Sequence, residues 1–221
     1  MLDIIEAESG PDPTATILIL HGLGADGNDF VPIAQELQLD QVGPVRFIFP
    51  HAPVMPVTIN NGYRMRAWYD ILGFGEDAPQ DEAGLRKSQQ LVDALLQREK
   101  DRGVPAHRIV LGGFSQGCAI SLMTGLRHPE RLAGIMGLSG YLPLADKTAA
   151  ERSSASLQTP IFLAHGTHDE VVGLDRAEAS RDALQALGHQ VEWHEYLMGH
   201  AVTPLEIEQL NAWLLGVLSA G

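Results

Sequence analysis

One serine of this chain lies in the setting that makes a hydroxyl group a nucleophile. Residues 113–117 read Gly-Phe-Ser-Gln-Gly, and a G-x-S-x-G sequence is typical of a sharp turn that exposes its serine between a strand and a helix. An apolar run at 109–111 indicates the strand, and apolar residues at helical spacing from Ala119 onward indicate the helix. A glycine-rich turn with an incidental serine is the alternative, but the flanking elements favour Ser115 as a nucleophile in acyl transfer.

A serine hydroxyl needs a base to take its proton and a carboxylate to orient that base. Where the nucleophile stands on a strand-to-helix turn, the acid follows the serine in the chain and the histidine comes last. Asp169 comes shortly after the apolar run 161–164, and so it follows a predicted strand, which makes it the expected acid. Its neighbour Glu170 remains the rival for this role.

Three histidines follow the expected acid. His189 lies in the turn before a predicted strand, and His194 lies within that strand. His200 comes just after the strand and before a predicted helix, so its loop can bring the imidazole over the serine. We therefore expect Ser115, Asp169 and His200 to form a catalytic triad.

The oxyanion formed during acyl transfer needs two hydrogen-bond donors. One is expected to be the backbone N–H of Gln116, the residue after the nucleophile. The other should come from the loop after an early strand, and residues 21–24 (His-Gly-Leu-Gly) follow the apolar run 14–20. We expect the N–H of Leu23 to be this second donor.

Residues 22–27 also match G-x-G-x-x-G, the pattern of a dinucleotide-binding turn. That pattern requires its glycines to open a helix, whereas Asn28 follows them here as the expected helix cap. The strand predicted at 45–49 ends without the acid that would hold a ribose. Dinucleotide binding is therefore disfavoured, and we expect no cofactor.

His165, His168 and Asp169 offer a second alternative, a metal cluster. Their spacing differs from that of helical zinc motifs, and no set of cysteines accompanies them. We therefore expect no metal site.

The expected triad residues follow different predicted strands, so the fold must bring the ends of these strands together. Strand-like apolar runs alternate with stretches at helical spacing, which predicts an α/β fold with a doubly wound, mostly parallel sheet that binds ligands at the carboxyl ends of its strands. Strands are expected at 3–7, 14–20, 45–49, 109–111, 132–138, 161–165 and 191–197, and helices after Asn28, at 81–102, from 119, at 175–187 and from 203. Segments 54–79 and 141–159 show no clear period and are expected to be irregular. Residues 1–221 contain no linker or repeat and are expected to form one domain.

The charge and composition of the chain argue against some classes of binding partner. The formal net charge is −13, and no basic stripe is present, which argues against nucleic acid as a partner. No apolar run is long enough to span a membrane, and the N-terminal residues lack a signal-peptide pattern. Cys118 is the single cysteine, so no disulfide is possible within the chain. We expect a cytoplasmic protein without an integral membrane segment; the sequence leaves a homodimer open.

Several further stretches accompany the serine motif. They are Leu-His-Gly-Leu-Gly at 20–24 with Asp-Gly at 26–27, Pro-His-Ala-Pro at 50–53, Ala-Trp-Tyr-Asp-Ile at 67–71, Asp-Glu-Ala-Gly-Leu at 81–85, Leu-Ser-Gly-Tyr-Leu-Pro at 138–143 and Met-Gly-His at 198–200. With Leu-Gly-Gly-Phe-Ser-Gln-Gly at 111–117, they resemble the phospholipase/carboxylesterase family of small α/β-hydrolases over nearly the whole chain. The resemblance implies an α/β-hydrolase fold without a large cap, the same triad, and the same two oxyanion donors.

The resemblance also implies an acyl groove lined by the loop after Trp68-Tyr69-Asp70. The irregular segment 66–75 carries apolar side chains between glycines, and we expect Trp68, Leu72 and Phe74 to contact substrate. Whether segment 54–79 moves as a lid stays open at this point.

The substrates implied by the resemblance are small-molecule esters or acylated molecules. They would carry short to medium acyl chains in ester or thioester linkage, and cleavage would pass through an acyl-enzyme. Carboxylesterase, acyl-protein thioesterase and lysophospholipase share this chemistry, and the sequence does not separate them. A binding module on an inactive scaffold is disfavoured because the three triad residues are intact. Cys118 departs from the family, where glycine is frequent, and implies a slightly bulkier helix.

Overall fold

The protein is built around one seven-stranded sheet in a computed structural model that describes residues 2–73, 75 and 78–219. The strand order is β1-β3-β2-β6-β7-β8-β9, with β1 antiparallel to β3 and all other neighbours parallel. The strands are β1 Ile4–Glu8, β2 Ala15–Leu20, β3 Val45–Pro50, β6 Ile109–Phe114, β7 Gly134–Leu138, β8 Ile161–Gly166 and β9 Val191–Tyr196. The predicted doubly wound, mostly parallel sheet is thus confirmed.

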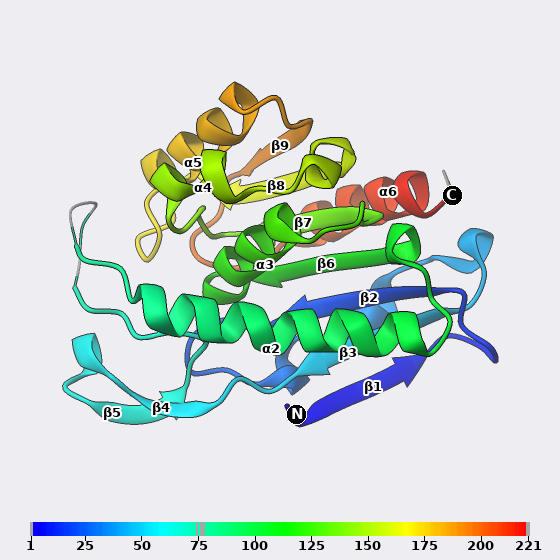
Figure 1. Cartoon of the computed structure of the whole chain (residues 1–221), viewed down its shortest axis with the longest axis horizontal. Coiled ribbons are helices and arrows are strands. Elements are labelled where there is room, and N and C mark those ends of the chain that lie inside the picture. Colours follow the sequence, from blue (N-terminus) through cyan, green and yellow to red (C-terminus); the bar gives the residue numbers. More distant parts are fainter. Residues whose placement is uncertain (1, 74, 76–77, 220–221) are drawn as a thin grey trace.

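Helices cover both faces of the sheet (Figure 1). They are α1 Val31–Glu36, α2 Glu82–Asp101, α3 Gln116–Arg127, α4 Ala145–Glu151, α5 Leu174–Ala186 and α6 Pro204–Ser219. One hydrophobic cluster includes side chains of α2, α3 and α5, and a second lies on the opposite face with side chains of α6. Strands β2, β3, β7 and β8 are buried along their whole length, because both of their faces pack against these layers. No helix within the described ranges is long and apolar enough to cross a membrane.

Segment 54–79 is more regular than expected. Strands β4 Val54–Val57 and β5 Tyr63–Arg66 form an antiparallel hairpin that projects beside the main sheet (Figure 1). The hairpin turn places Asn61 and Gly62 at φ 55° and 75°, and an Asn-Gly pair is suited to this left-handed conformation. An isolated antiparallel bridge then joins Ile71 to Gln80 and closes the base of the following loop.

Two other local expectations are corrected. Segment 141–159 contains helix α4 and a 3₁₀ turn at Ser154–Gln158 rather than irregular chain. Asn28 does not cap the helix after β2, because this element begins as a 3₁₀ turn at Gly27 with Asp26 as the cap. The Asp26 carboxylate accepts a hydrogen bond from the backbone N–H of Asn28 at 2.8 Å.

Candidate active site

The residues expected to form the triad follow three strands that all run in one direction. Ser115 follows β6, Asp169 lies three residues after β8, and His200 lies four residues after β9. The carboxyl ends of parallel strands meet at one edge of the sheet. The topology therefore brings the three segments to the same edge.

Ser115 occupies a strained turn between β6 and α3. Its backbone has φ 56° and ψ −115°, outside the regions that non-glycine residues ordinarily adopt. The flanking glycines are required by crowding, because a Cβ atom on Gly113 would lie 2.4 Å from the Gly117 carbonyl carbon. A Cβ atom on Gly117 would in turn lie 2.1 Å from the carbonyl oxygen of Leu20. A strained strand-to-helix turn with a glycine on each side of the serine is the backbone geometry that the G-x-S-x-G sequence predicts.

Asp169 and His200 form the hydrogen bond expected of a base and its orienting acid. His200 Nδ1 lies 2.7 Å from Asp169 Oδ2, and the Asp169 side chain is fully buried. The other oxygen, Oδ1, accepts the backbone N–H groups of Val171 and Val172 at 2.9 Å each. These donors hold the carboxylate in one orientation. The rival Glu170 is exposed.

The imidazole of His200 packs beside the serine turn. Its ring centroid lies 4.7 Å from that of Phe114, the residue before Ser115. The two other candidate histidines lie elsewhere: His194 lies 2.8 Å from a Glu192 carboxylate oxygen on β9, and His189 is buried before β9 begins.

The loop that was expected to supply an oxyanion donor lies against the serine. A Cβ atom on Gly22 would lie 3.4 Å from Ser115 Cβ, and Leu20 at the end of β2 is in register with Gly113 on β6. Among the described residues, neither the Leu23 N–H nor the Gln116 N–H donates to an acceptor of the protein. Two free backbone donors therefore lie next to the serine turn.

Trp68 does not line a groove. It is only 2% exposed, and its indole N–H donates to the backbone carbonyl of His21 at 2.9 Å. The expectation that Trp68 contacts substrate is corrected, because its aromatic side chain belongs to the core beneath the site.

Leu72 is 40% exposed and lines a small cleft that is partly open to solvent. The cleft lies between residues 69–73, 75 and 78–81 and two further side chains, Tyr141 and Arg176. The guanidinium of Arg176 stacks on the Tyr141 ring. Phe74, the third residue expected to contact substrate, lies outside the described residues.

Three other side chains near the site, His165, His168 and Cys118, could also take part in chemistry. The Nε2 atom of His165 donates to the carbonyl of Val172, and His168 is exposed, so the two do not converge on one point. The part of the chain that the structure describes holds no group of three ligands suited to a metal ion. Burial raises the pKa of the Cys118 thiol to about 12, which keeps the thiol protonated.

Comparison with known proteins identifies related chains. Residues 3–217 match the family model described as Phospholipase/Carboxylesterase. Acyl-protein thioesterase 1 of Yarrowia lipolytica is 43% identical over 206 residues, with 91% of each chain covered. The crystal structure of Arabidopsis thaliana SOBER1 superposes with a TM-score of 0.88 at 31% identity, covering 92% of this chain and 99% of that one. Zea mays acyl-protein thioesterase 2 superposes with a TM-score of 0.84 at 32% identity, covering 97% and 99%.

Proposed function

Because the chain belongs to the phospholipase/carboxylesterase family and is a serine hydrolase with the α/β-hydrolase fold, we propose that Ser115, Asp169 and His200 are its catalytic triad. The observation that carries the proposal is the 2.7 Å contact between His200 and the buried Asp169, with the imidazole packed against Phe114. A serine hydrolase requires this chain of nucleophile, base and orienting acid.

The first half of the reaction acylates the enzyme. The Ser115 hydroxyl attacks the carbonyl carbon of the ester or thioester while His200 Nε2 takes its proton. The carbonyl π electrons move to the oxygen and form a tetrahedral oxyanion. When the oxyanion collapses, the bond to the alcohol or thiol breaks, and the imidazolium returns its proton to that leaving group. Asp169 stabilises the imidazolium and fixes its tautomer through Nδ1.

The second half returns the enzyme to its starting state. A water molecule attacks the acyl-serine carbonyl, and His200 accepts the proton that the water loses. Collapse of the second oxyanion releases the carboxylic acid, and the proton returns to the Ser115 oxygen. The backbone N–H groups of Leu23 and Gln116 stabilise both oxyanions, and the absence of an acceptor for either group among the described residues supports that role.

The proposed substrates are esters and thioesters of short to medium acyl chains. The cleft beside Leu72 is the proposed acyl groove, because it is lined by Tyr69, whose carbonyl accepts a hydrogen bond at 2.8 Å from the side-chain amide of Gln116, the residue after Ser115. Relatives named acyl-protein thioesterase, at about 40% identity over most of the chain, support thioester-linked acyl groups on proteins as the natural substrate. Action in the cytoplasm is part of the proposal, since the lone thiol of Cys118 is buried and unpaired.

Labelling with a fluorophosphonate probe tests the triad. The probe should attach to Ser115 of the parent, and Ser115→Ala should abolish both labelling and turnover of p-nitrophenyl esters. Triad knockouts cost on the order of 10⁴-fold to 10⁶-fold in rate. Ser121→Ala, which replaces a buried serine on α3 six residues after Ser115, is the matched control and should label normally. Turnover by Ser115→Ala within about tenfold of the parent would exclude Ser115 as the nucleophile.

A further inference from the structure

A buried histidine that takes no part in the proposed proton transfers lies at the start of the oxyanion loop. His21 is 1% exposed and directly follows β2. Its Nε2 atom accepts the backbone N–H of Ala52 at 3.0 Å, and its Nδ1 atom lies 2.7 Å from the carbonyl oxygen of Gly22. Both ring nitrogens are therefore committed to backbone groups.

These contacts define one protonation state. A nitrogen that accepts a hydrogen bond carries no proton, so Nε2 is bare and Nδ1 carries the hydrogen that it donates to Gly22. Burial is the largest influence on the pKa of His21 and lowers it, which favours the neutral ring. The charged and titratable groups around the ring are Asp26, His51 and Arg66.

The carbonyl that His21 binds belongs to the same peptide group as the Leu23 N–H. In a planar trans peptide the C=O and N–H bonds point in opposite directions. Fixing the Gly22 oxygen on the imidazole side therefore aims the Leu23 hydrogen to the other side. Donation to the carbonyl also polarises the peptide and makes its N–H a stronger donor.

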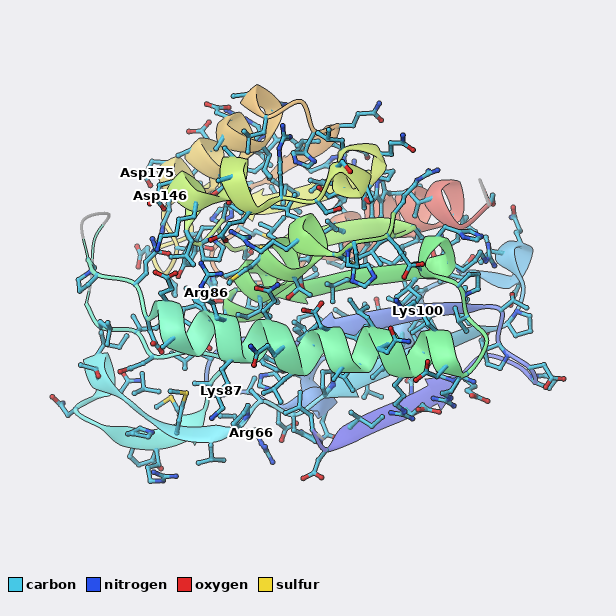
Figure 2. All side chains as sticks on the ribbon, viewed as in Figure 1. Arg66, Arg86, Lys87, Lys100, Asp146 and Asp175 are labelled. Atoms are coloured by element: carbon cyan, nitrogen blue, oxygen red, sulfur yellow. The ribbon has the colours of Figure 1, made fainter. Side chains whose placement is uncertain are left out.

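Neighbouring contacts hold this peptide from outside. The Gly24 N–H donates to the carbonyl of Arg66, at the end of β5, where the chain leaves the hairpin; Figure 2 labels this residue. The Trp68 indole donates to the His21 carbonyl, while the Gln116 side-chain oxygen accepts the Trp68 N–H at 3.0 Å. Trp68 thus links His21 to Gln116, the residue whose N–H is the other proposed oxyanion donor.

From these contacts we propose that His21 is a positioning residue, which in its neutral Nδ1–H form sets the direction of the Leu23 N–H in the oxyanion hole. The inference rests on the proposed function, since it assigns the aim of a donor that the triad reaction uses. His21 touches no reacting atom, and its effect passes entirely through the Gly22–Leu23 peptide.

Two substitutions separate the bonds that His21 makes. Asparagine can place its amide nitrogen where Nδ1 lies and keep the donor to Gly22, whereas glutamine can place its oxygen where Nε2 lies and keep only the acceptor for Ala52. Losing an oxyanion donor costs about 10²-fold to 10³-fold in kcat. We therefore expect His21→Gln to lower kcat about 10²-fold, and His21→Asn to recover activity to within about tenfold of the parent. KM should change little in both, because the donor acts on the transition state.

His189→Gln is the matched control. His189 is also buried, its pKa is also lowered by burial, and it lies before β9, at the opposite edge of the sheet from the triad. This variant should keep the kcat of the parent, with melting temperatures recorded for all three variants. Equal kcat losses in His21→Asn and His21→Gln, or the parent kcat in His21→Gln, would overturn the proposal.

Nitrogen NMR of the histidine-labelled parent gives a measurement that does not depend on how a variant folds. His21 should still hold the neutral Nδ1–H form at about pH 6.5, where an ordinary histidine is about half protonated, because burial lowers its pKa. An Nε2–H form would contradict the proposal. Fluorophosphonate labelling separates the two levels of inference: failure of Ser115 to react refutes the triad itself, whereas labelling of His21→Gln at the parent's rate refutes only the role of His21.

Discussion

Glu206 should make the protein less stable as the pH rises toward neutrality. This residue lies in the first turn of α6, four residues before Leu210, and is fully buried. The Thr203 hydroxyl accepts the backbone N–H of Glu206, and the Glu206 Oε2 atom accepts the Thr203 N–H at 3.4 Å, so the two residues form a capping box. Its Oε1 atom has no hydrogen-bond partner among the described residues.

Burial raises the pKa of the Glu206 carboxyl from 4.5 to about 7, against the opposing effect of the Thr203 N–H. The folded state thus holds a proton that the unfolded state loses from about pH 4.5 upward. Because the unfolded state binds fewer protons in this interval, the free energy of unfolding falls as the pH rises from 4.5 to 7. At 1.36 kcal/mol per pKa unit, this one group removes about 3 kcal/mol.

Glu206→Gln keeps an acceptor for the Thr203 N–H and carries no charge at any pH. Urea unfolding at pH 4.5 and pH 8 should therefore show a variant close to the parent at the lower pH and more stable by up to about 3 kcal/mol at the higher. Tyr196 faces this carboxyl, and its own ionisation lies above the tested range. Glu208→Gln, an exposed position on the same helix, is the control and should change stability by less than about 0.5 kcal/mol. A gain in Glu206→Gln that is equal at both pH values would refute the reasoning, because a difference in packing alone is independent of proton binding.

Two other predictions concern the site. Asp169→Asn should lower kcat on the order of 10⁴-fold, because an amide reverses the tautomer of His200, whereas the exposed Glu170→Gln should stay within about threefold; a larger loss at position 170 would transfer the acid role to it. Lengthening an ester by two carbons should raise kcat/KM by up to about tenfold until the groove is full, at about 0.8 kcal/mol per buried methylene. Replacing Leu72 and Phe74 by alanine should flatten this dependence and leave acetate esters nearly unchanged; parallel profiles from acetate to decanoate esters would remove these residues from the groove.

The sequence predicts best where apolar periodicity and chain order act together. Strands β2, β3, β7 and β8 are runs of mostly apolar residues, and they are buried on both faces of the sheet. Such a run is typical of a buried parallel strand, so the position of each strand can be predicted from its own residues. Asp169 and His200 are expected from their places after strands, because parallel strands deliver such residues to one edge. Their mutual hydrogen bond is the part that only the structure supplies.

Short elements and the roles of individual side chains could not be predicted from apolar periodicity and chain order. Each strand of the β4–β5 hairpin has four residues with mixed polarity, and Pro56 weakens the strand pattern, although Asn61-Gly62 was a usable turn signal. Trp68 shows that an aromatic residue in an irregular stretch can be core as readily as groove wall. The role of His21 depends on two backbone partners, one of them 31 residues away, which no local pattern encodes.

The loop between Ile71 and Gln80 is held at both ends, so its sequence can change substrate preference without disturbing the rest of the fold. Ile71 and Gln80 are bridged to each other, the Ile71 carbonyl accepts the N–H of Ile59, and the Gln80 side chain accepts the N–H of Leu144. Both ends are thus anchored independently of what lies between them, and closing a longer loop costs only about 0.6 kcal/mol for each doubling of its length. Insertions or replacements between these anchors can reshape the wall of the cleft while the segments that carry Ser115, Asp169 and His200 stay in place. A library of sequence changes in the loop between Ile71 and Gln80 would therefore alter acyl preference with little loss in the free energy of unfolding.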